Sequence, residues 1–412
     1  MKLLKTDISR MTLYENNLEI DFTTSQRVTS DAIYELNQIT DNVYANPVIE
    51  LAGINASGKT MTLKVIKLVI SLLNGMNLNS LSEKELFLEL IGDEPVVLKM
   101  YYFWEGNFYF LKTKIGRRKS KRNPMDEELW ICEESLYKSK PKAKITKNNW
   151  IRQPGEENSI YELVPFADRE KASDFLPDDV SVNVAMVNKN REPLTCCDFL
   201  GTVNHNYMKV FGEYIPDILH LLDPNIEYLK MERNEEGNRF RWLLKFKNRS
   251  SVFSLNSPED LELYLSSGTI KGIGIFSMSI AMFYAGGYIL VDELENHFNL
   301  QIVKCLLDLF VSRTTNRNGA TILFSTHYPG LLDIPSRNDA VYILSNNEKI
   351  SCKNLSVLKK RNDGRKPSKA FAENLLNVTT APSYQAFIKL KELIENIESV
   401  DRIDITEEEN AG

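Results

Sequence analysis

The octapeptide GINASGKT, Gly53 to Thr60, constrains the fold of this 412-residue chain more than any other stretch. It matches the pattern G-x-x-x-x-G-K-[ST] at every fixed position, and the apolar segment NPVIELAG leads into it. Residues 61–76 follow, with apolar side chains at helical spacing. A glycine-rich loop between a buried strand and a helix directs its backbone N–H groups at a phosphate. The sequence therefore predicts a P-loop, and with it a nucleotide site.

Each fixed position of this loop has a chemical reason. Gly53 and Gly58 let the backbone wrap closely around a phosphate, Lys59 reaches the β- and γ-phosphates, and the Thr60 hydroxyl takes a position on Mg²⁺. We therefore expect ATP and Mg²⁺ as ligands. The predicted binding residues are Gly53, Asn55, Ala56, Ser57, Gly58, Lys59 and Thr60.

Two acidic residues follow another buried run, YILVDE. An acidic residue at the end of such a strand binds the magnesium of a P-loop site, so Asp292 and Thr60 are the predicted metal ligands. Glu293 comes next, and a carboxylate there can polarise the water that attacks the γ-phosphate. The run ATILFSTH ends at His327, a position beside the nucleotide crevice in this fold class. Glu293 and His327 are the predicted catalytic residues.

The stretch LYLSSGTIKGIG, Leu263 to Gly274, places hydroxyl residues and a glycine before a predicted helix. A hydroxyl and the free N–H groups at a helix start favour an anion, so the stretch could hold a second phosphate. The alternative is an ordinary serine N-cap before an apolar run.

Periodicity predicts an α/β fold with helices flanking a sheet that is largely parallel. From Leu263 onward, helix, strand, helix and strand alternate. The other predicted elements are hairpins over residues 94–116 and 226–248, a strand over 176–188, a helix over 204–222 interrupted at Pro216, and a last helix over 383–400. The acidic tail after that helix is expected to be disordered.

Basic residues gather between Lys112 and Lys147, although the net charge of the chain is −6. One interpretation is a solvated hairpin arm. The other is a patch that contacts nucleic acid or an acidic partner. The candidate contact residues are Arg117, Arg118, Lys119, Lys121 and Arg122.

Composition indicates the compartment in which the chain works. Five scattered cysteines without partners at ligand spacing indicate reduced thiols, and the N-terminus lacks the layout of a secretory signal. The chain contains no run of eighteen apolar residues, so we expect no membrane span and a cytoplasmic location.

These motifs, in this order, resemble the ATP-binding-cassette type of ATPase, in the branch shared with structural-maintenance-of-chromosomes (SMC) and recombination-repair ATPases. The resemblance is carried by GINASGKT, LSSGT, ILVDELENHF and FSTH. Within that branch the chain looks like small bacterial AAA-family ATPases of the AbiL/RloA-like kind, related to overcoming-lysogenization-defect and phage-defense ATPases. The resemblance covers roughly residues 1–75 and 255–385.

The resemblance implies an ABC-type P-loop ATPase head with a mixed sheet and an inserted α+β lid or arm region. The implied parts are residues 1–75 and 256–385 for the head, 76–255 for the insert, and 386–412 for a C-terminal helix and acidic tail. It also implies that LSSGT is a signature loop. In such ATPases two chains meet head to tail, and the signature loop of one contacts the γ-phosphate held by the other. The implied contact residues are Ser266, Ser267 and Gly268.

The chain also departs from that family. Gln153 is the sole glutamine between residues 76 and 255, and its context does not suit a glutamine loop. Asn299 stands where an acidic or polar residue might couple two sites, and His297 is a candidate for the dimer seam. Slow hydrolysis is therefore expected, with ATP serving mainly to clamp a dimer. The middle region carries no sustained heptads, so no long coiled coil is expected.

Three functions follow as hypotheses. The first is an ATP-gated dimeric switch in bacterial anti-phage defense that controls a partner effector, a nuclease or a toxin. The second is a DNA repair or recombination ATPase that binds DNA through the basic region. The third is an ATP-dependent scaffold with little hydrolysis.

Overall fold

A computed structural model of the chain describes residues 1–121, 123–172, 174–190, 192–201, 216–233, 240–257, 259–296, 298–335, 337–359, 364–373 and 385–394. Contacts divide the chain into two units, residues 1–378 and 379–412. In the second unit, residues 385–394 form a helix, within the range predicted for the last helix. The elements described below belong to the first unit.

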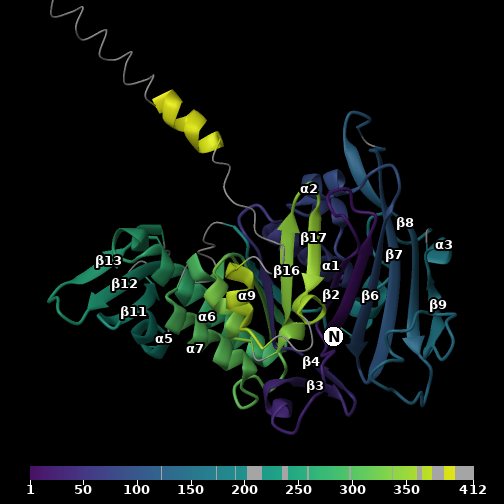
Figure 1. Ribbon diagram of the computed structural model, residues 1–412, viewed down its shortest axis with the longest axis horizontal. Coiled ribbons are helices and arrows are strands. Elements are labelled where there is room, and N and C mark those ends of the chain that lie inside the picture. Colours follow the sequence, from purple (N-terminus) through teal and green to yellow (C-terminus); the bar gives the residue numbers. More distant parts are fainter. Residues whose placement is uncertain are drawn as a thin grey trace, which may run out of the picture. The chain divides into compact units, whose positions relative to one another are not determined.

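The P-loop follows a strand of a six-stranded sheet in the order β10-β14-β15-β5-β16-β17, of which β16 and β17 are labelled in Figure 1. These strands are β10 (Cys196–Phe199), β14 (Tyr288–Val291), β15 (Thr321–Thr326), β5 (Val48–Ala52), β16 (Val341–Asn346) and β17 (Ile350–Asn354). Neighbours are parallel except β16 and β17, so the predicted mixed sheet is confirmed. Every residue of β5, β14 and β15 is buried because both faces are covered.

A second, antiparallel sheet has the order β2-β1-β6-β7-β8-β9. Its strands are β2 (Leu18–Asp21), β1 (Lys2–Ser9), β6 (Val96–Trp104), β7 (Asn107–Lys119), β8 (Glu127–Ser139) and β9 (Tyr161–Asp168). The predicted first hairpin is confirmed as β6 and β7, in which Val96 pairs with Ile115 at one end and Trp104 with Asn107 at the other.

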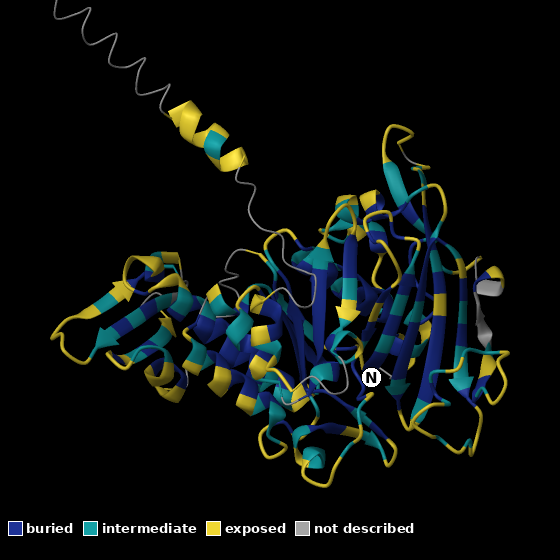
Figure 2. Ribbon diagram, in the orientation of Figure 1, coloured by how far each residue is buried: buried dark blue, intermediate teal, exposed yellow. Residues whose placement is uncertain are grey.

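Helix α1 (Lys59–Leu73) lies between the two sheets. Its Leu63 and Ile66 belong to one core with Leu98 of the antiparallel sheet and Leu323 of the parallel sheet, and all four are at most 1% exposed. Figure 2 shows the strands of both sheets as largely buried. The helix that starts at the P-loop is therefore held from both sides, which fixes the loop in place.

Two further helices, α6 (Ser267–Ala285) and α7 (Leu300–Val311), cover the other face of the parallel sheet. Ile275 of α6 and Val303 of α7 share a core with Val291 and Phe324 of the sheet. By length and composition alone, α6 is long and apolar enough to cross a membrane, and 61% of its most apolar window is buried. That burial is typical of the core helix of a globular unit.

A three-stranded sheet packs against the start of α6. It consists of β11 (Ile226–Arg233), β12 (Phe240–Phe246) and β13 (Val252–Leu255). Strands β11 and β12 are the predicted second hairpin, and Trp242 packs with Ile270 of α6 in a small core of their own.

The remaining elements are short. The paired strands β3 (Asn37–Thr40) and β4 (Val43–Ala45) form a small ribbon. The short α-helices are α2 (Lys84–Leu90), α3 (Arg169–Ala172), α4 (Val184–Asn190), α5 (Pro216–Leu222), α8 (Leu355–Leu358) and α9 (Pro367–Ala372). The 3₁₀ turns include η1 (Ala32–Glu35), η2 (Leu78–Ser80), η4 (Glu259–Leu263), η5 (Leu294–Asn296), η6 (Pro329–Asp333) and η7 (Asn338–Ala340).

Two sequence-based assignments need correction. Residues 176–188 were predicted as a strand but form turns leading into α4. A buried polar contact favours the turn over a strand. The Asn183 side chain donates to the Leu73 carbonyl of α1, and this bond holds the segment as a turn. Strand β10 was not predicted, since four residues are too short to show a period. Of the helix predicted over residues 204–222, residues 204–215 lie outside the described residues and α5 forms the rest.

The region predicted as an insert, residues 76–255, is distributed over three sheets. Strands β6–β9 extend the antiparallel sheet next to β1. Strand β10 pairs with β14 in the parallel sheet, and β11–β13 form the small third sheet. The predicted domain boundaries themselves remain a prediction.

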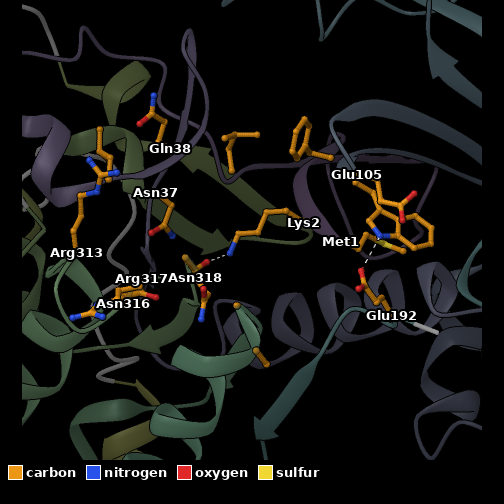
Figure 3. Close-up of a pocket in the computed structure, with 17 residues that line it drawn as sticks. Met1, Lys2, Asn37, Gln38, Glu105, Glu192, Arg313, Asn316, Arg317 and Asn318 are labelled. Atoms are coloured by element: carbon orange, nitrogen blue, oxygen red, sulfur yellow. Dashed lines mark hydrogen bonds between the residues drawn. The ribbon is translucent and has the colours of Figure 1, made fainter. Parts of the chain in front are cut away.

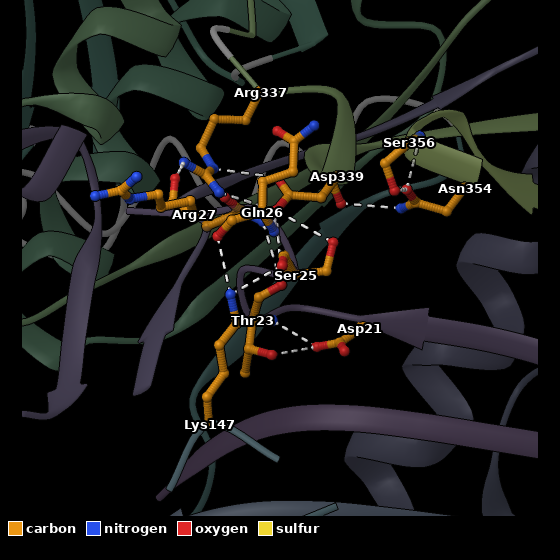
Figure 4. Close-up of polar contacts among 11 residues, drawn as sticks. Asp21, Thr23, Ser25, Gln26, Arg27, Lys147, Arg337, Asp339, Asn354 and Ser356 are labelled. Carbon is orange, nitrogen blue, oxygen red and sulfur yellow. Dashed lines mark hydrogen bonds and ion pairs between the residues drawn. The ribbon is translucent and has the colours of Figure 1, made fainter. Parts of the chain in front are cut away.

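A buried ion pair ties the loop after β2 to the parallel sheet (Figure 4). Asp339 is 2% exposed and pairs with Arg337 at 3.0 Å. The same carboxylate accepts backbone hydrogen bonds from Ser25 and Gln26 at 2.9 and 2.8 Å, and Lys147 donates to both of their carbonyls. One buried carboxylate thus organises a connection between segments more than 300 residues apart in sequence.

Candidate nucleotide site

The glycines of the P-loop stand where a side chain does not fit. Gly58 has a φ of 95°, and a Cβ there would lie 2.6 Å from Cδ1 of Ile350. A Cβ on Gly53 would lie 2.7 Å from the Leu344 carbonyl oxygen. Ala56 also adopts a positive φ, of 60°. The loop is therefore shaped by close backbone approach, as the sequence pattern predicts for a phosphate cradle.

Lys59 opens α1 with its amine held inside the loop. Its Nζ donates to the carbonyls of Gly53 and Ile54, each at 2.9 Å. Burial lowers the pKa of Lys59, and the nearby carboxylates, Glu293 first among them, act in the opposite direction. The amine is thus fixed at the mouth of the loop, where a phosphate oxygen would replace a carbonyl as its partner.

The candidate metal ligands meet although 232 positions separate them. The Thr60 hydroxyl donates to Asp292 Oδ2 at 2.7 Å. On the other side of that carboxylate, Oδ1 accepts a hydrogen bond from the Ser325 hydroxyl. Ser325 is the last residue but one of β15, so two neighbouring strands and α1 converge here. Sequence reasoning missed Ser325, because a serine within an apolar strand carries no signal of its own.

Glu293 has an unusual backbone and a defined side chain. Its φ is 48°, a left-handed conformation that is uncommon for a residue other than glycine. Its backbone N–H donates to Ser325 Oγ at 2.8 Å, and its Oε2 accepts from Asn296 at 2.6 Å. Non-glycine residues in this conformation cluster at functional sites, where the surrounding bonds hold them. Asn296 is a second residue that the sequence did not point to.

A hollow of about 430 Å³ opens beside these groups. The lining residues are Leu13, Asn55, Ala56, Ser57, Gly58, Lys59, Thr60, Met61, Lys64, Leu86, Glu293, Asn346 and Ile350. Leu13, Leu86 and Ile350 contribute apolar surface to the lining, and Ile350 packs directly against Gly58 of the loop. Asn346 fastens the loop by donating to the Ala56 carbonyl at 3.1 Å. Leu13, Leu86, Asn346 and Ile350 come from segments outside the P-loop, so the P-loop pattern could not identify them.

The residues present fit a magnesium nucleotide. The Ser57 hydroxyl is buried and lacks a hydrogen-bond partner among the described residues, so it is available to a phosphate. Thr60 and Asp292 supply hard oxygen ligands. No group of three or more His, Cys, Asp or Glu side chains that could hold a metal occurs in the described part of the chain. A cation bound by two protein oxygens and by phosphates agrees with that finding.

His327 follows β15 and is held by Glu295. Its Nδ1 lies 3.0 Å from Glu295 Oε1, and its backbone N–H donates to the same oxygen at 2.6 Å. Glu295 belongs to η5, directly after the two acidic residues of the site. His297, which follows η5 in sequence, lies outside the described residues. Asn299 caps α7 through the backbone N–H groups of Gln301 and Ile302.

Lys271 brings an unexpected positive charge near the acidic pair. Burial lowers the pKa of Lys271, while Asp292 and Glu293 act to raise it. The lysine lies one turn into α6, next to the predicted signature loop. Sequence reasoning missed it because a single lysine in the glycine-rich stretch KGIG resembles a surface charge.

The predicted signature loop lies outside the hollow. Ser266 is the N-cap of α6, and its hydroxyl accepts from the Thr269 N–H at 3.0 Å. Ser266 and Ser267 are exposed, and none of the described residues that line the hollow comes from positions 266–268. Ser266 therefore serves as the N-cap of α6, and its contact with a phosphate of a second chain stays a prediction. The N–H groups of Ser267 and Gly268 belong to the first turn, where they have no partner within the helix.

The basic stretch runs along β7 and the turn after it, with acidic partners. Arg118 pairs with Glu128 at 2.9 Å and with Asp178 at 2.6 Å, and Lys121 pairs with Asp178 at 2.9 Å. Hydrogen bonds from Lys121 and then Arg118 lower the pKa of Asp178 to about 2. Arg117 lies 3.9 Å from Glu127, Lys119 is exposed, and Arg122 lies outside the described residues. These pairs neutralise much of the cluster.

Another hollow, of about 470 Å³, lies beside the first residues of β1 (Figure 3). Lys2 is buried there and donates to the Gly319 carbonyl, and burial lowers the pKa of Lys2 to about 7. Asn316 and Asn318 donate to backbone carbonyls. Their amides therefore support the loop before β15, and the sequence motifs contribute nothing to this hollow.

A family model described as "AAA domain, putative AbiEii toxin, Type IV TA system" matches residues 258–333. That segment includes α6, the acidic pair after β14, and His327. No curated protein matches the chain. Among solved structures, the SMC head domain from Thermotoga maritima is similar at a TM-score of 0.40 and 10% identity, over 86% of this chain and 99% of that one.

The chain thus has an α/β fold with a mixed, largely parallel sheet that carries a P-loop, and its residues 258–333 match a model of an AAA domain. This agrees with the predicted fold class. The finer resemblance to AbiL/RloA-like proteins stays a prediction, as do the roles assigned to the individual site residues.

Proposed function

We propose that the chain binds Mg²⁺-ATP at the P-loop and hydrolyses it slowly. The observation that carries this proposal is the convergence of Lys59, Thr60, Asp292 and Glu293 beside one hollow, from α1 and from the end of β14. A P-loop alone would support nucleotide binding. The addition of an oriented carboxylate next to the metal ligands supports hydrolysis.

In the proposed reaction, the loop N–H groups and Lys59 bind the β- and γ-phosphates. Thr60 and Asp292 hold the cation, which supplies charge neutralisation to the phosphates when bound. Glu293, oriented by Asn296, accepts a proton from the attacking water. His327 donates a hydrogen bond to the γ-phosphate from beside β15.

We further propose a head-to-tail homodimer in which Ser266, Ser267 and Gly268 of one chain contact the γ-phosphate bound by the other. Exposure of this loop away from the hollow of its own chain supports that arrangement. The uncapped N–H groups at the start of α6 suit a phosphate. Since the Ser266 hydroxyl already caps Thr269, Ser267 and Gly268 are the stronger contacts in this proposal.

For the biological role we propose a nucleotide-gated switch in anti-phage defense that controls an effector protein. The family model over residues 258–333 carries a description that names a toxin–antitoxin system, which supports this choice. A cytoplasmic site of action is part of the proposal, and the five cysteines, none of them in a disulfide, suit a reducing compartment. The ion pairs along β7 lend the DNA-repair alternative no support.

Glu293→Gln is the direct test of the switch. It keeps the side-chain size but removes the base, so ATP should stay bound and the dimer should persist, as measured by light scattering with ATP. Wild-type protein should return to monomer as ATP is consumed. A Glu293→Gln chain that stays monomeric with saturating ATP would exclude the dimeric switch, and a wild type that never releases phosphate would favour the scaffold alternative.

Ser267→Trp separates binding from dimerisation. The bulky side chain should leave ATP affinity unchanged, because Ser267 does not line the hollow of its own chain. It should abolish the ATP-dependent dimer of the Glu293→Gln background. A similar substitution at exposed Tyr284, on the last turn of α6, serves as the matched control.

A further inference from the structure

Glu295 is a largely buried acid that contacts His327. Its side chain is 12% exposed, whereas that of His327 is 38% exposed. One of its oxygens, Oε1, holds His327 at two points, the backbone N–H and Nδ1. The carboxylate therefore fixes both the chain direction after β15 and the rotation of the imidazole.

The contact decides which ring nitrogen faces a ligand. With Nδ1 engaged by Glu295, Nε2 is the nitrogen left for a phosphate. A neutral imidazole that donates through Nδ1 has no proton on Nε2. Nε2 donates to a phosphate only when both ring nitrogens carry a proton, and the Glu295 carboxylate lies 3.0 Å from Nδ1 to accept from it.

A second buried carboxyl, that of Glu50, lies close enough to Glu295 to feel its charge. Glu50, in the middle of β5, has both side-chain oxygens buried with no hydrogen-bond partner among the described residues, and the same holds for Oε2 of Glu295. Burial first, and then the charges of Glu295 and Asp333, raise the pKa of Glu50 to about 8. Glu50 is therefore mostly protonated near pH 7 and places no second negative charge beside this contact.

We propose that Glu295 is the positioning residue of the hydrolytic site, holding His327 through Nδ1 and the backbone so that Nε2 is directed to the terminal phosphate. This inference rests on the proposed ATPase function. Glu295 acts through His327 and contacts no substrate. Gln at position 295 keeps an oxygen for the backbone N–H of residue 327, so Glu295→Gln should have no further effect once the imidazole is gone.

The test is a double-mutant cycle on the full chain, with kcat and KM for ATP hydrolysis as readouts. Glu295→Gln should lower kcat by about 10-fold or more, with KM changed less than about twofold. The double variant Glu295→Gln with His327→Ala should match His327→Ala alone. Glu295→Asp, which keeps the charge on a shorter side chain, should recover part of the lost rate. Binding of a non-hydrolysable ATP analogue should be equal in all variants, which also verifies that they fold.

Glu157→Gln, at an exposed position away from the site, is the control and should leave kcat unchanged. Additive losses in the double variant, or a wild-type kcat for Glu295→Gln, would overturn this inference while leaving the proposed ATPase intact. A wild-type chain that binds ATP without releasing phosphate would overturn both.

Discussion

The Thr60 hydroxyl and the Asp292 carboxylate are joined by a 2.7 Å hydrogen bond across 232 residues of sequence. One oxygen begins the P-loop helix α1, and the other follows β14 of the parallel sheet. Two hard oxygens at that separation form one edge of a coordination shell for a small divalent cation. The pair therefore links the phosphate loop to the end of β14.

Loss of the Thr60 hydroxyl should weaken binding of the magnesium nucleotide specifically. Thr60→Val keeps the side-chain shape but removes one metal ligand, so affinity for Mg²⁺-ATP should fall by about 10-fold or more, which is about 1.4 kcal/mol. Affinity for ATP in EDTA should change much less. Thr60→Ser keeps the hydroxyl and should bind like wild type. Titration of a fluorescent ATP analogue measures all three, and equal affinity of the Val and Ser variants would contradict the assignment.

Gly58 should tolerate a side chain less well than a glycine of similar backbone conformation elsewhere. Gly155 has a φ of 88° with nothing within 4 Å of a Cβ, whereas Gly58 has a φ of 95° and a Cβ would meet Ile350. Gly155→Ala should cost about 1–2 kcal/mol of unfolding free energy from backbone strain alone. Gly58→Ala should cost about 1–3 kcal/mol more through overpacking, and should also reduce ATP binding. Urea unfolding of both variants checks the difference, which a Gly58→Ala variant as stable as Gly155→Ala would refute.

Glu50 should make the stability of the fold depend on pH. Its pKa is raised from 4.5 to about 8, chiefly by burial, so the folded state retains a proton that the unfolded chain releases. The stability from this group is complete below about pH 4.5 and is lost as the pH rises to about 8.

Glu50→Gln removes the ionisable group and therefore the loss of folding stability at high pH. The melting temperature of Glu50→Gln should equal that of wild type near pH 5 and exceed it at pH 9 by at least about 2 °C. Calorimetry at the two pH values measures the difference, with the exposed Glu157→Gln as a control that should show none. A constant difference across the range would mean that Glu50 is ionised throughout.

Asp339 should be among the most sensitive positions for stability. Asp339→Ala leaves Arg337 buried without its partner and removes the acceptor for the Ser25 and Gln26 backbone N–H groups. The expected cost is about 3–5 kcal/mol of unfolding free energy. Arg10→Met breaks an exposed pair with Glu94 and should cost less than about 1 kcal/mol. Denaturant unfolding measures both, and comparable costs would show that the buried network contributes little.

Motifs with a fixed spacing predicted the fold class and the phosphate loop. GINASGKT requires a strand before it and a helix after it, and β5 and α1 occupy those places. The apolar runs of β14 and β15 were recognisable because strands covered on both faces are continuously hydrophobic. A short strand such as β10 was not, and a segment with buried polar anchors, residues 176–188, was read with the wrong period.

The basic stretch shows a different kind of failure. A row of lysines and arginines suggests a free positive patch, yet Arg118 and Lys121 meet acidic residues that arrive from β8 and from the turn at Asp178. Cross-strand partners are set by register, which a single stretch of sequence does not contain.

Local chemistry along the chain was thus enough to select the phosphate loop, the acidic pair and the histidine as candidates, because the roles proposed for them demand particular residue types at particular spacings. The surroundings of those groups come from folding. Packing of separate segments brings Ser325 to Asp292, Glu295 to His327 and the buried Glu50 close to Glu295. Burial and distance change the proton affinity and orientation of a side chain, and both quantities exist once the chain has packed.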